Sequence, residues 1–401
     1  MSKTNTSEKK VVLPLSNETP ITFDLRSGIP FMATLSYDSI KNDVWNWIFT
    51  DYMQLVCGKK KSCKLKYNFF RIFEPYNPFL IRKFDCHYRK SWRNTNKTLN
   101  YVIENISNGY YIHLKLDRYF MPGFAGFNEK HIMHTECIYG FDLEKEELYL
   151  IGFTDFTNSS LKKTTLSFRD FLRAFESFLN QHIFHTITLD KVKLNTKFDF
   201  DKEKMVGNLY DYINSTLSLQ KIYDSNKDKQ TIFAWDFPIK TLYGIEGLNH
   251  MSKLIEYVCE NQKLTRIRKF LQINCEFHKI MFLRIKYLYE KFNLPENFYK
   301  EYSEIYEDFN LIKFIYLKYD VTDNKDYLET VIEKLESNAK KSEWLLQRIL
   351  FELNGKKEFA QSIPTLKKKI EIIKHLIIAV FKDVKFFVIN VLWEQIILRV
   401  K

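Results

Sequence analysis

The stretch HTECIYGFDLEKEELYLIGFTDF, residues 134–156, decides the fold that we expect for this chain. Two runs rich in aromatic and aliphatic residues, 136–142 and 147–155, lie on either side of the charged turn LEKE. Such runs around a short polar turn are typical of an antiparallel hairpin. The sequence therefore predicts a β-sheet that contains this hairpin.

The segments around the hairpin predict further strands and helices of the same domain. Apolar and polar residues alternate over 110–117, which favours a strand, and 185–194 is a further strand candidate. Apolar residues recur at helical spacing over 36–58, 97–109 and 167–181. The first half of the chain is thus expected to mix helices with a sheet.

After about residue 200 the sequence changes to long amphipathic stretches near the 3.6-residue period of a helix. We predict an α+β protein with a disordered N-terminus at 1–10, a mixed domain at 11–200 and a helical domain at 201–401. The apolar segment 383–400 fits either a strand or a helix, and it could pack back on the first domain.

Composition narrows the class of protein. The 401 residues are 45% hydrophobic and 27% charged, which is ordinary for a globular protein. The formal charge of +12 does not predict a nucleic-acid partner, because the lysines are spread along the chain and alternate with acids; it could instead attract an acidic protein. Without an apolar export segment or a run long enough to cross a bilayer, we expect a cytoplasmic protein with no membrane partner.

The segment HIMHTECIYGFD, residues 131–142, allows a metal site or a catalytic base. His131, His134 and Cys137 are three residues apart, so a helix would place all three on roughly one side. A structural zinc site needs four ligands in paired clusters, and the sequence shows no second cluster. The residues after Cys137 also favour a strand over a helix. We therefore expect no metal here.

The catalytic alternative depends on the hairpin. His134 stands before one strand and Asp155 ends the next, where an imidazole can donate a hydrogen bond to a carboxylate. In papain-like folds a cysteine nucleophile opens a helix in the first third of the domain, and the base histidine starts a strand. Any hairpin with a histidine and an aspartate meets this spacing, so a pair without chemistry stays open on spacing alone.

Five stretches resemble one family of cysteine-peptidase-like proteins, namely NGYYIHLKLDRYFMPG (108–123), HIMHTECIYGFD (131–142), LYLIGFTDF (148–156), YGIEGLNHMSKLIEYV (243–258) and EFHKIMFLRIKYL (276–288). The family includes the butirosin biosynthesis protein H type and is encoded beside nonribosomal peptide and related thiotemplate gene clusters. It shares its fold with the bacteriocin-processing cysteine peptidases. The resemblance thus implies a papain-like domain followed by a mostly helical domain.

The resemblance also implies acyl transfer in natural-product biosynthesis. A cysteine thiolate would take an acyl group from the phosphopantetheine thioester of a carrier protein, and a small-molecule amine would then form the amide. His134 would be the general base and acid, and Asp155 would orient it. His131 and His278 would contact the substrate, although most helix residues such as His278 are structural. No cofactor of the protein's own is implied.

The nucleophile that the family implies is missing from residues 30–40. We assign the vacated cysteine slot to Ala33, lost naturally or by engineering, and consider Ser36 as a weaker hydroxyl replacement or a substrate contact. Two alternatives to an amide-forming acyltransferase therefore stay open. One is a catalytically inactive relative that binds a carrier protein as a scaffold, and the other is a peptidase or thioesterase-type hydrolase on the same fold.

Overall fold

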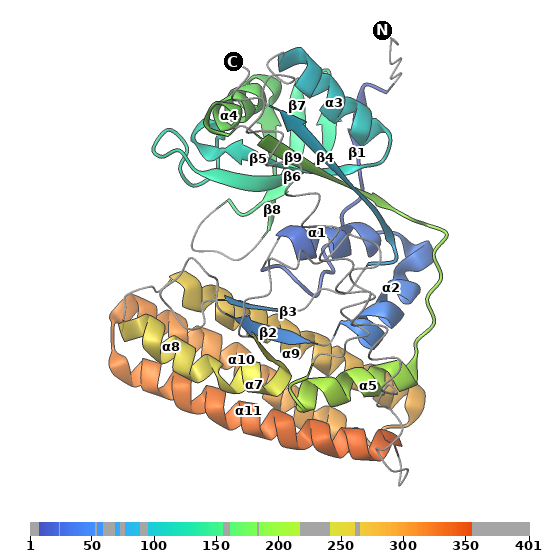
Figure 1. The fold of residues 1–401 in the computed structure, drawn as a ribbon, viewed down its shortest axis with the longest axis vertical. Helices are drawn as coiled ribbons and strands as arrows, with labels where there is room; N and C mark the ends of the chain where they lie inside the picture. The colour runs from blue at the N-terminus through green and yellow to red at the C-terminus, as the bar shows by residue number, and fades with distance from the viewer. Residues whose placement is uncertain are drawn as a thin grey trace, which may run out of the picture.

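The structure is a computed structural model, and it describes the residue ranges 8–23, 25–52, 54–58, 69–72, 77–88, 95–154, 161–182, 184–216, 241–260 and 265–354. Figure 1 shows a part built on a β-sheet, drawn at the top, and a part made mainly of long helices below it. The predicted α+β class is therefore confirmed.

The main sheet is antiparallel, with strand order β4-β9-β5-β6-β7-β8 and β1 beside β6. Its strands are β1 (Lys10–Val12), β4 (Leu80–Tyr88), β5 (Tyr111–Asp117), β6 (Met133–Asp142), β7 (Glu147–Gly152), β8 (Lys162–Ser167) and β9 (Phe184–Val192). The predicted hairpin is β6–β7, in which Ile138 pairs with Leu150 ahead of a bulge. The strands predicted at 110–117 and 185–194 are confirmed as β5 and β9.

Helices cover both faces of this sheet (Figure 1). On one face α3 (Thr95–Ser107) and α4 (Phe168–Gln181) bury Ile138 of β6 in a shared apolar cluster. On the other face α1 (Leu25–Thr34) shares a cluster with Cys137 and Tyr139 of the same strand. Because side chains alternate along a strand, even-numbered residues of β6 before the bulge face α3 and α4, and odd-numbered ones face α1.

The second half of the chain forms the helical part. Its helices are α5 (Lys202–Ile213), α7 (Gly244–Asn249), α8 (Met251–Glu260), α9 (Thr265–Phe292), α10 (Glu296–Thr322) and α11 (Lys325–Asn354). The long helices predicted after residue 200 are thus confirmed wherever the structure describes them. In this layer α10 packs between α9 and α11, and its Tyr302, Ile312 and Tyr316 are fully buried.

A second, three-stranded sheet joins the two halves. Its strands are β2 (Leu55–Gly58), β3 (Phe69–Ile72) and β10 (Thr241–Tyr243), and Val56 pairs with both Tyr243 and Arg71. The helix expected over 36–58 is therefore shorter than predicted. It becomes α2 (Asp38–Asp51), because its last apolar residues join this small sheet.

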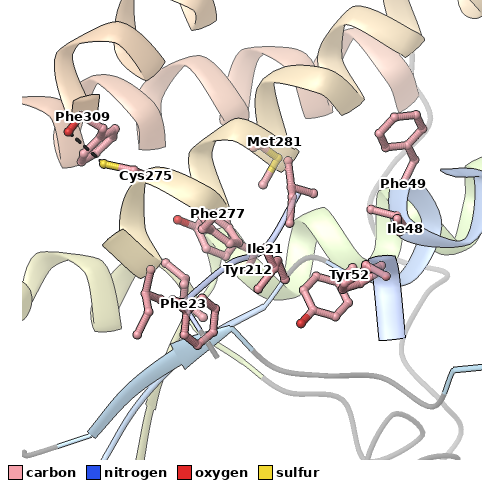
Figure 2. Packing of buried hydrophobic residues seen from close by; sticks show 14 of the residues in the cluster. Ile21, Phe23, Ile48, Phe49, Tyr52, Tyr212, Cys275, Phe277, Met281 and Phe309 are labelled. Carbon is pink, nitrogen blue, oxygen red and sulfur yellow. Dashed lines mark hydrogen bonds between the residues drawn. The ribbon is translucent and has the colours of Figure 1, made fainter. Parts of the chain in front are cut away.

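A buried arginine of α9 fixes the end of α2. Arg284 is 1% exposed and donates hydrogen bonds to the carbonyl oxygens of Ile48 (3.0 Å), Phe49 (2.7 Å) and Tyr52 (2.8 Å). The last carbonyls of a helix lack partners in a further turn, and this side chain supplies donors to them, in addition to the Tyr52 N–H that donates to Ile48 at 3.1 Å. Burial lowers the pKa of Arg284 to about 9, which leaves it charged at neutral pH. Figure 2 shows Ile48 and Tyr52 beside the helix that carries Met281.

A buried glutamate of the same helix fixes the approach to α1. Glu276 is 5% exposed and accepts hydrogen bonds from the backbone N–H of Thr22 (2.9 Å) and Phe23 (3.2 Å) and from the Thr22 hydroxyl. Burial raises the pKa of Glu276 although these hydrogen bonds oppose it. In Figure 2, Ile21 and Phe23 lie close to Phe277 of α9. One helix thus positions both α1 and α2.

Candidate active site

His134, the second residue of β6, carries the imidazole of the candidate site. Its backbone pairs with Leu116 of β5, and 35% of its side chain is exposed. Its Nδ1 lies 2.9 Å from Oε1 of Glu136, which follows two residues later and therefore shares its face of the strand. The sequence analysis missed Glu136. The strand predicted at 136–142 begins three residues earlier in the structure, and extending it back to His134 would have placed both side chains on one face.

A buried ion pair supports His134. Arg118 and Glu136 are 1% and 0% exposed, and the Arg118 Nε donates to Glu136 Oε1 at 2.7 Å. The guanidinium lies over the ring of Phe124, 5.2 Å from its centre. A Cβ at Gly152 would lie only 2.0 Å from Glu136 Oε2, so the carboxylate needs glycine there. Tight packing of a paired, buried carboxylate fixes its position against the imidazole.

The Nδ1 of His134 has two competing partners, because Nη2 of Arg118 lies 3.0 Å away and Glu136 lies 2.9 Å away. A protonated Nδ1 donates to the carboxylate and leaves Nε2 with a free lone pair. An unprotonated Nδ1 accepts from the arginine, and Nε2 then carries the proton. The imidazole can thus keep one position whether Nε2 carries a proton or a free lone pair, and general acid–base catalysis uses both states.

His131 stands beside this site with a buried carboxylate of its own. Its side chain is 54% exposed, its Nδ1 lies 2.6 Å from Oδ2 of Asp117, and its ring stacks on Tyr119 at 4.4 Å. Asp117 also accepts from the Ser177 hydroxyl and from the Ile132 N–H. Burial would raise the pKa of Asp117, but hydrogen bonds led by those of Ser177 and His131 hold it below its usual value. The loop from β5 to β6 is thus anchored.

The structure does not bring Ala33 to His134. Ala33 lies in the last turn of α1, 1% exposed, in the cluster that contains Cys137 and therefore on the opposite side of β6 from His134. Ser36 lies just beyond α1, where its hydroxyl donates to the Ala33 carbonyl at 2.7 Å. The nucleophile was expected within residues 30–40 at the start of a helix, but Ala33 lies at the end of α1 and the next helix, α2, begins only at Asp38.

The first turn of α1 lies at the same end of the sheet as His134. A Cβ at Gly28 would lie 3.2 Å from a methyl group of Leu161, which leads directly into β8. The first residue of β8, Lys162, pairs with Gly152, against which Glu136 packs. Asp155, the predicted orienting residue, lies outside the described residues.

The cysteines whose burial the structure describes are poor nucleophiles. Cys57, Cys137 and Cys275 are all free and buried. Burial raises the pKa of Cys57 and of Cys275 to about 12, and it raises the pKa of Cys137 well above its usual value. A thiol reacts as its thiolate. None of these three side chains is therefore suited to attack an acyl group at neutral pH.

His278 is a packing residue of the helical part. Its side chain is fully buried, its Nδ1 lies 2.8 Å from the Tyr302 hydroxyl, and its ring stacks on Phe309 with centres 3.8 Å apart. Burial lowers the pKa of His278 to about 3. The predicted contact with substrate is replaced by contacts between α9 and α10.

A further polar cluster lies buried on the α1 side of the sheet. Asp190 accepts two hydrogen bonds of 2.7 Å from Arg82, and Nε2 of His113 lies 3.3 Å from its Oδ2. Cys137 stands opposite His113 on the neighbouring strand. His113, Cys137 and Asp190 are at most 5% exposed, so the cluster is closed to substrate and stabilises the sheet from within.

The described residues hold no group of three or more histidine, cysteine or acidic side chains placed to bind a metal ion. No helix within the described ranges combines the length and apolar character that crossing a membrane requires.

Comparison with known proteins adds no family to this picture. The chain matches no family model and no curated protein. The class that the fold defines is an α+β protein in which an antiparallel sheet with helices on both faces precedes a layer of long helices.

Proposed function

We propose that the protein is a papain-like acyltransferase that forms an amide from a carrier-bound acyl thioester and an amine. The observation that carries the proposal is the partly exposed His134 whose Nδ1 contacts the fully buried Glu136. This arrangement supplies a base with one accessible nitrogen, held by a carboxylate, as acyl-transfer sites require. Glu136 takes the orienting role that the sequence analysis gave to Asp155.

In the proposed reaction the amine attacks the thioester directly. The hydrogen bonds of His134 within the described residues go to Arg118 and Glu136, and neither is a nucleophile. Nε2 of His134 takes a proton from the attacking amine as the carbon–nitrogen bond forms. It returns that proton to the carrier thiolate as the carbon–sulfur bond breaks. Atoms and charge balance without a covalent acyl-enzyme.

The proposed partner is an acidic acyl or peptidyl carrier protein in the cytoplasm. The charge of +12 supports this partner, because opposite net charge accelerates encounter over long distances. His131 supports it locally, because its imidazole near His134 in the chain is 54% exposed and offers a polar contact to a partner. The carrier's phosphopantetheine would deliver the thioester, and no cofactor of the protein's own enters the reaction.

The second candidate function is a scaffold that binds the carrier without catalysis. The observation that favours it is the burial of Cys57, Cys137 and Cys275, since none of them supplies the thiolate that the family implies. A hydrolase is the third candidate. It would use the same base and differ only in taking water as the acceptor.

The test is intact mass spectrometry of a reaction that contains acylated carrier protein and amine. We expect amide and free carrier thiol with the wild type, no acyl adduct on the protein, and loss of amide in His134→Ala. Glu136→Gln should lower the rate by about a hundredfold, because the base loses its oriented tautomer. His182→Ala, at the end of α4, is the matched control and should retain full rate.

Each other outcome selects a different function. Amide formation that survives His134→Ala would reject the catalytic role of this residue. Carrier binding without turnover would select the scaffold, and free acid in place of amide would select the hydrolase. An acyl adduct on the protein would replace direct attack by a covalent route.

A further inference from the structure

A groove between α2 and α9 forms a second candidate site, built from residues that the proposed function does not use. It encloses about 520 Å³ and is lined on the α2 side by Trp45 and Phe49 and on the α9 side by Lys286, Tyr287 and Lys291. Small-molecule sites commonly enclose about 300–1,000 Å³. The groove therefore has room for a ligand of ordinary metabolite size.

One wall of the groove belongs to a series of aromatic rings in contact, which we call the aromatic ladder. The ring of Trp45 stacks on Phe49 at 5.3 Å, Phe49 lies 5.0 Å from Tyr287, and the series continues to Phe200 and Phe292 with spacings of 5.0 and 5.2 Å. Trp45, at the end of this ladder, is only partly buried. Stacking on a planar group is the interaction that such a ring offers.

Hydrogen bonds hold the groove open in a fixed shape. The Tyr287 hydroxyl donates to Oδ1 of Asn46 at 3.1 Å, and Nδ2 of Asn46 donates to the carbonyl oxygen of Phe198 at 3.2 Å. Arg284, which caps α2, lies one turn before Tyr287 on the same helix and also fixes the spacing of α2 and α9. The walls are thus set before any ligand arrives, which lowers the entropy lost on binding.

The charges at the rim favour an anion. Lys286 lies 3.8 Å from Glu290, so these two side chains largely offset each other. Lys291, in the last turn of α9, takes part in no ion pair within the described part of the chain. The groove therefore carries one uncompensated positive charge in a protein of net charge +12.

We propose that this groove binds a small planar aromatic compound that carries one anionic group. The ring stacks on Trp45, and the anion contacts Lys291. This proposal is independent of the proposed acyl transfer, because the groove shares no residue with the His134 site.

The test uses 2-naphthoate as the probe and 2-naphthylmethanol as its uncharged counterpart, with binding to the full chain measured by calorimetry. We expect saturable binding of 2-naphthoate to a single site. Trp45→Leu should weaken it about tenfold, and Trp45→Phe should restore most of the affinity because a ring is again present. Lys291→Gln should weaken 2-naphthoate about threefold and leave 2-naphthylmethanol unchanged.

The matched control is Trp344→Leu, which removes an exposed tryptophan from α11 and should not alter binding. Thermal unfolding of each variant shows whether it is folded. Equal affinity of the wild type and Trp45→Leu would overturn the site, as would non-saturable binding. Equal affinity for the acid and the alcohol, or an unchanged affinity in Lys291→Gln, would overturn the anionic part of the ligand.

Discussion

Burial of His278 should make the stability of the helical part depend on pH. Burial lowers the pKa of this histidine from an ordinary 6.5 to about 3 in the folded chain. Between these two values the unfolded chain binds a proton that the folded chain excludes. The free energy of unfolding therefore rises with pH across this window. The stabilisation is complete above about pH 6.5 and is lost as the pH falls towards 3.

The size of the effect follows from the same two pKa values. At about pH 5 the unfolded imidazole is almost fully protonated and the folded one is neutral, which lowers the free energy of unfolding by about 2 kcal/mol relative to pH 7. His278→Phe removes the titrating group and keeps a ring against Phe309. The variant should therefore lose about 2 kcal/mol less than the wild type between these two pH values.

Urea unfolding followed by circular dichroism at about pH 7 and pH 5 measures the difference, because α9, α10 and α11 dominate the helical signal. Tyr302→Phe is the matched control, since it removes the hydroxyl next to Nδ1 but keeps the imidazole buried. It should retain the pH dependence of the wild type. The same loss of stability in His278→Phe as in the wild type would refute the reasoning.

Three further predictions test other contacts. Gly152→Ala places a Cβ against the Glu136 carboxylate. It should lower the free energy of unfolding by about 2 kcal/mol in urea titrations and abolish amide formation. The control Gly207→Ala adds its methyl group in open space on α5 and should leave the free energy of unfolding unchanged or raise it. Arg284→Met removes the side-chain hydrogen bonds to three carbonyl oxygens at the end of α2 and should lower the free energy of unfolding by about 3 kcal/mol in the same titrations. Cys57, Cys137 and Cys275 should be labelled by a thiol reagent only in urea when the labelled sites are mapped by peptide mass spectrometry, and fast labelling of any of these three in buffer would contradict their burial.

The elements with a strong local pattern were predictable from the sequence. The β6–β7 hairpin shows its turn chemistry directly, and α10 and α11 repeat apolar residues at helical spacing over many turns. Helix α1 was missed because Pro30 lies inside it, and a proline usually marks a helix boundary. The small sheet was missed because its strands come from distant parts of the chain, and no local signal reports such pairing.

The candidate site was predictable only in part. The position of His134 at the start of a strand followed from the hairpin, but nothing in the local pattern distinguishes its partner Glu136 from other polar strand residues. The charged residues Glu276 and Arg284 look solvated in a helical pattern, because sequence periodicity does not show that backbone groups of another helix lie against them. Tertiary contacts overrode the local pattern at these positions.

Helix α9 hydrogen-bonds to the approach to α1 and to the end of α2, which limits where the chain can be truncated. A fragment that stops near residue 200 would lack Arg284 and Glu276. It would therefore lose the hydrogen bonds that Arg284 donates to three carbonyl oxygens and those that Glu276 accepts from two backbone N–H groups. It would also lack β10, the strand that completes the pairing of β2. Truncation at this boundary should yield an aggregating polypeptide, because the helical part completes the hydrogen bonding of the segment that carries α1 and α2.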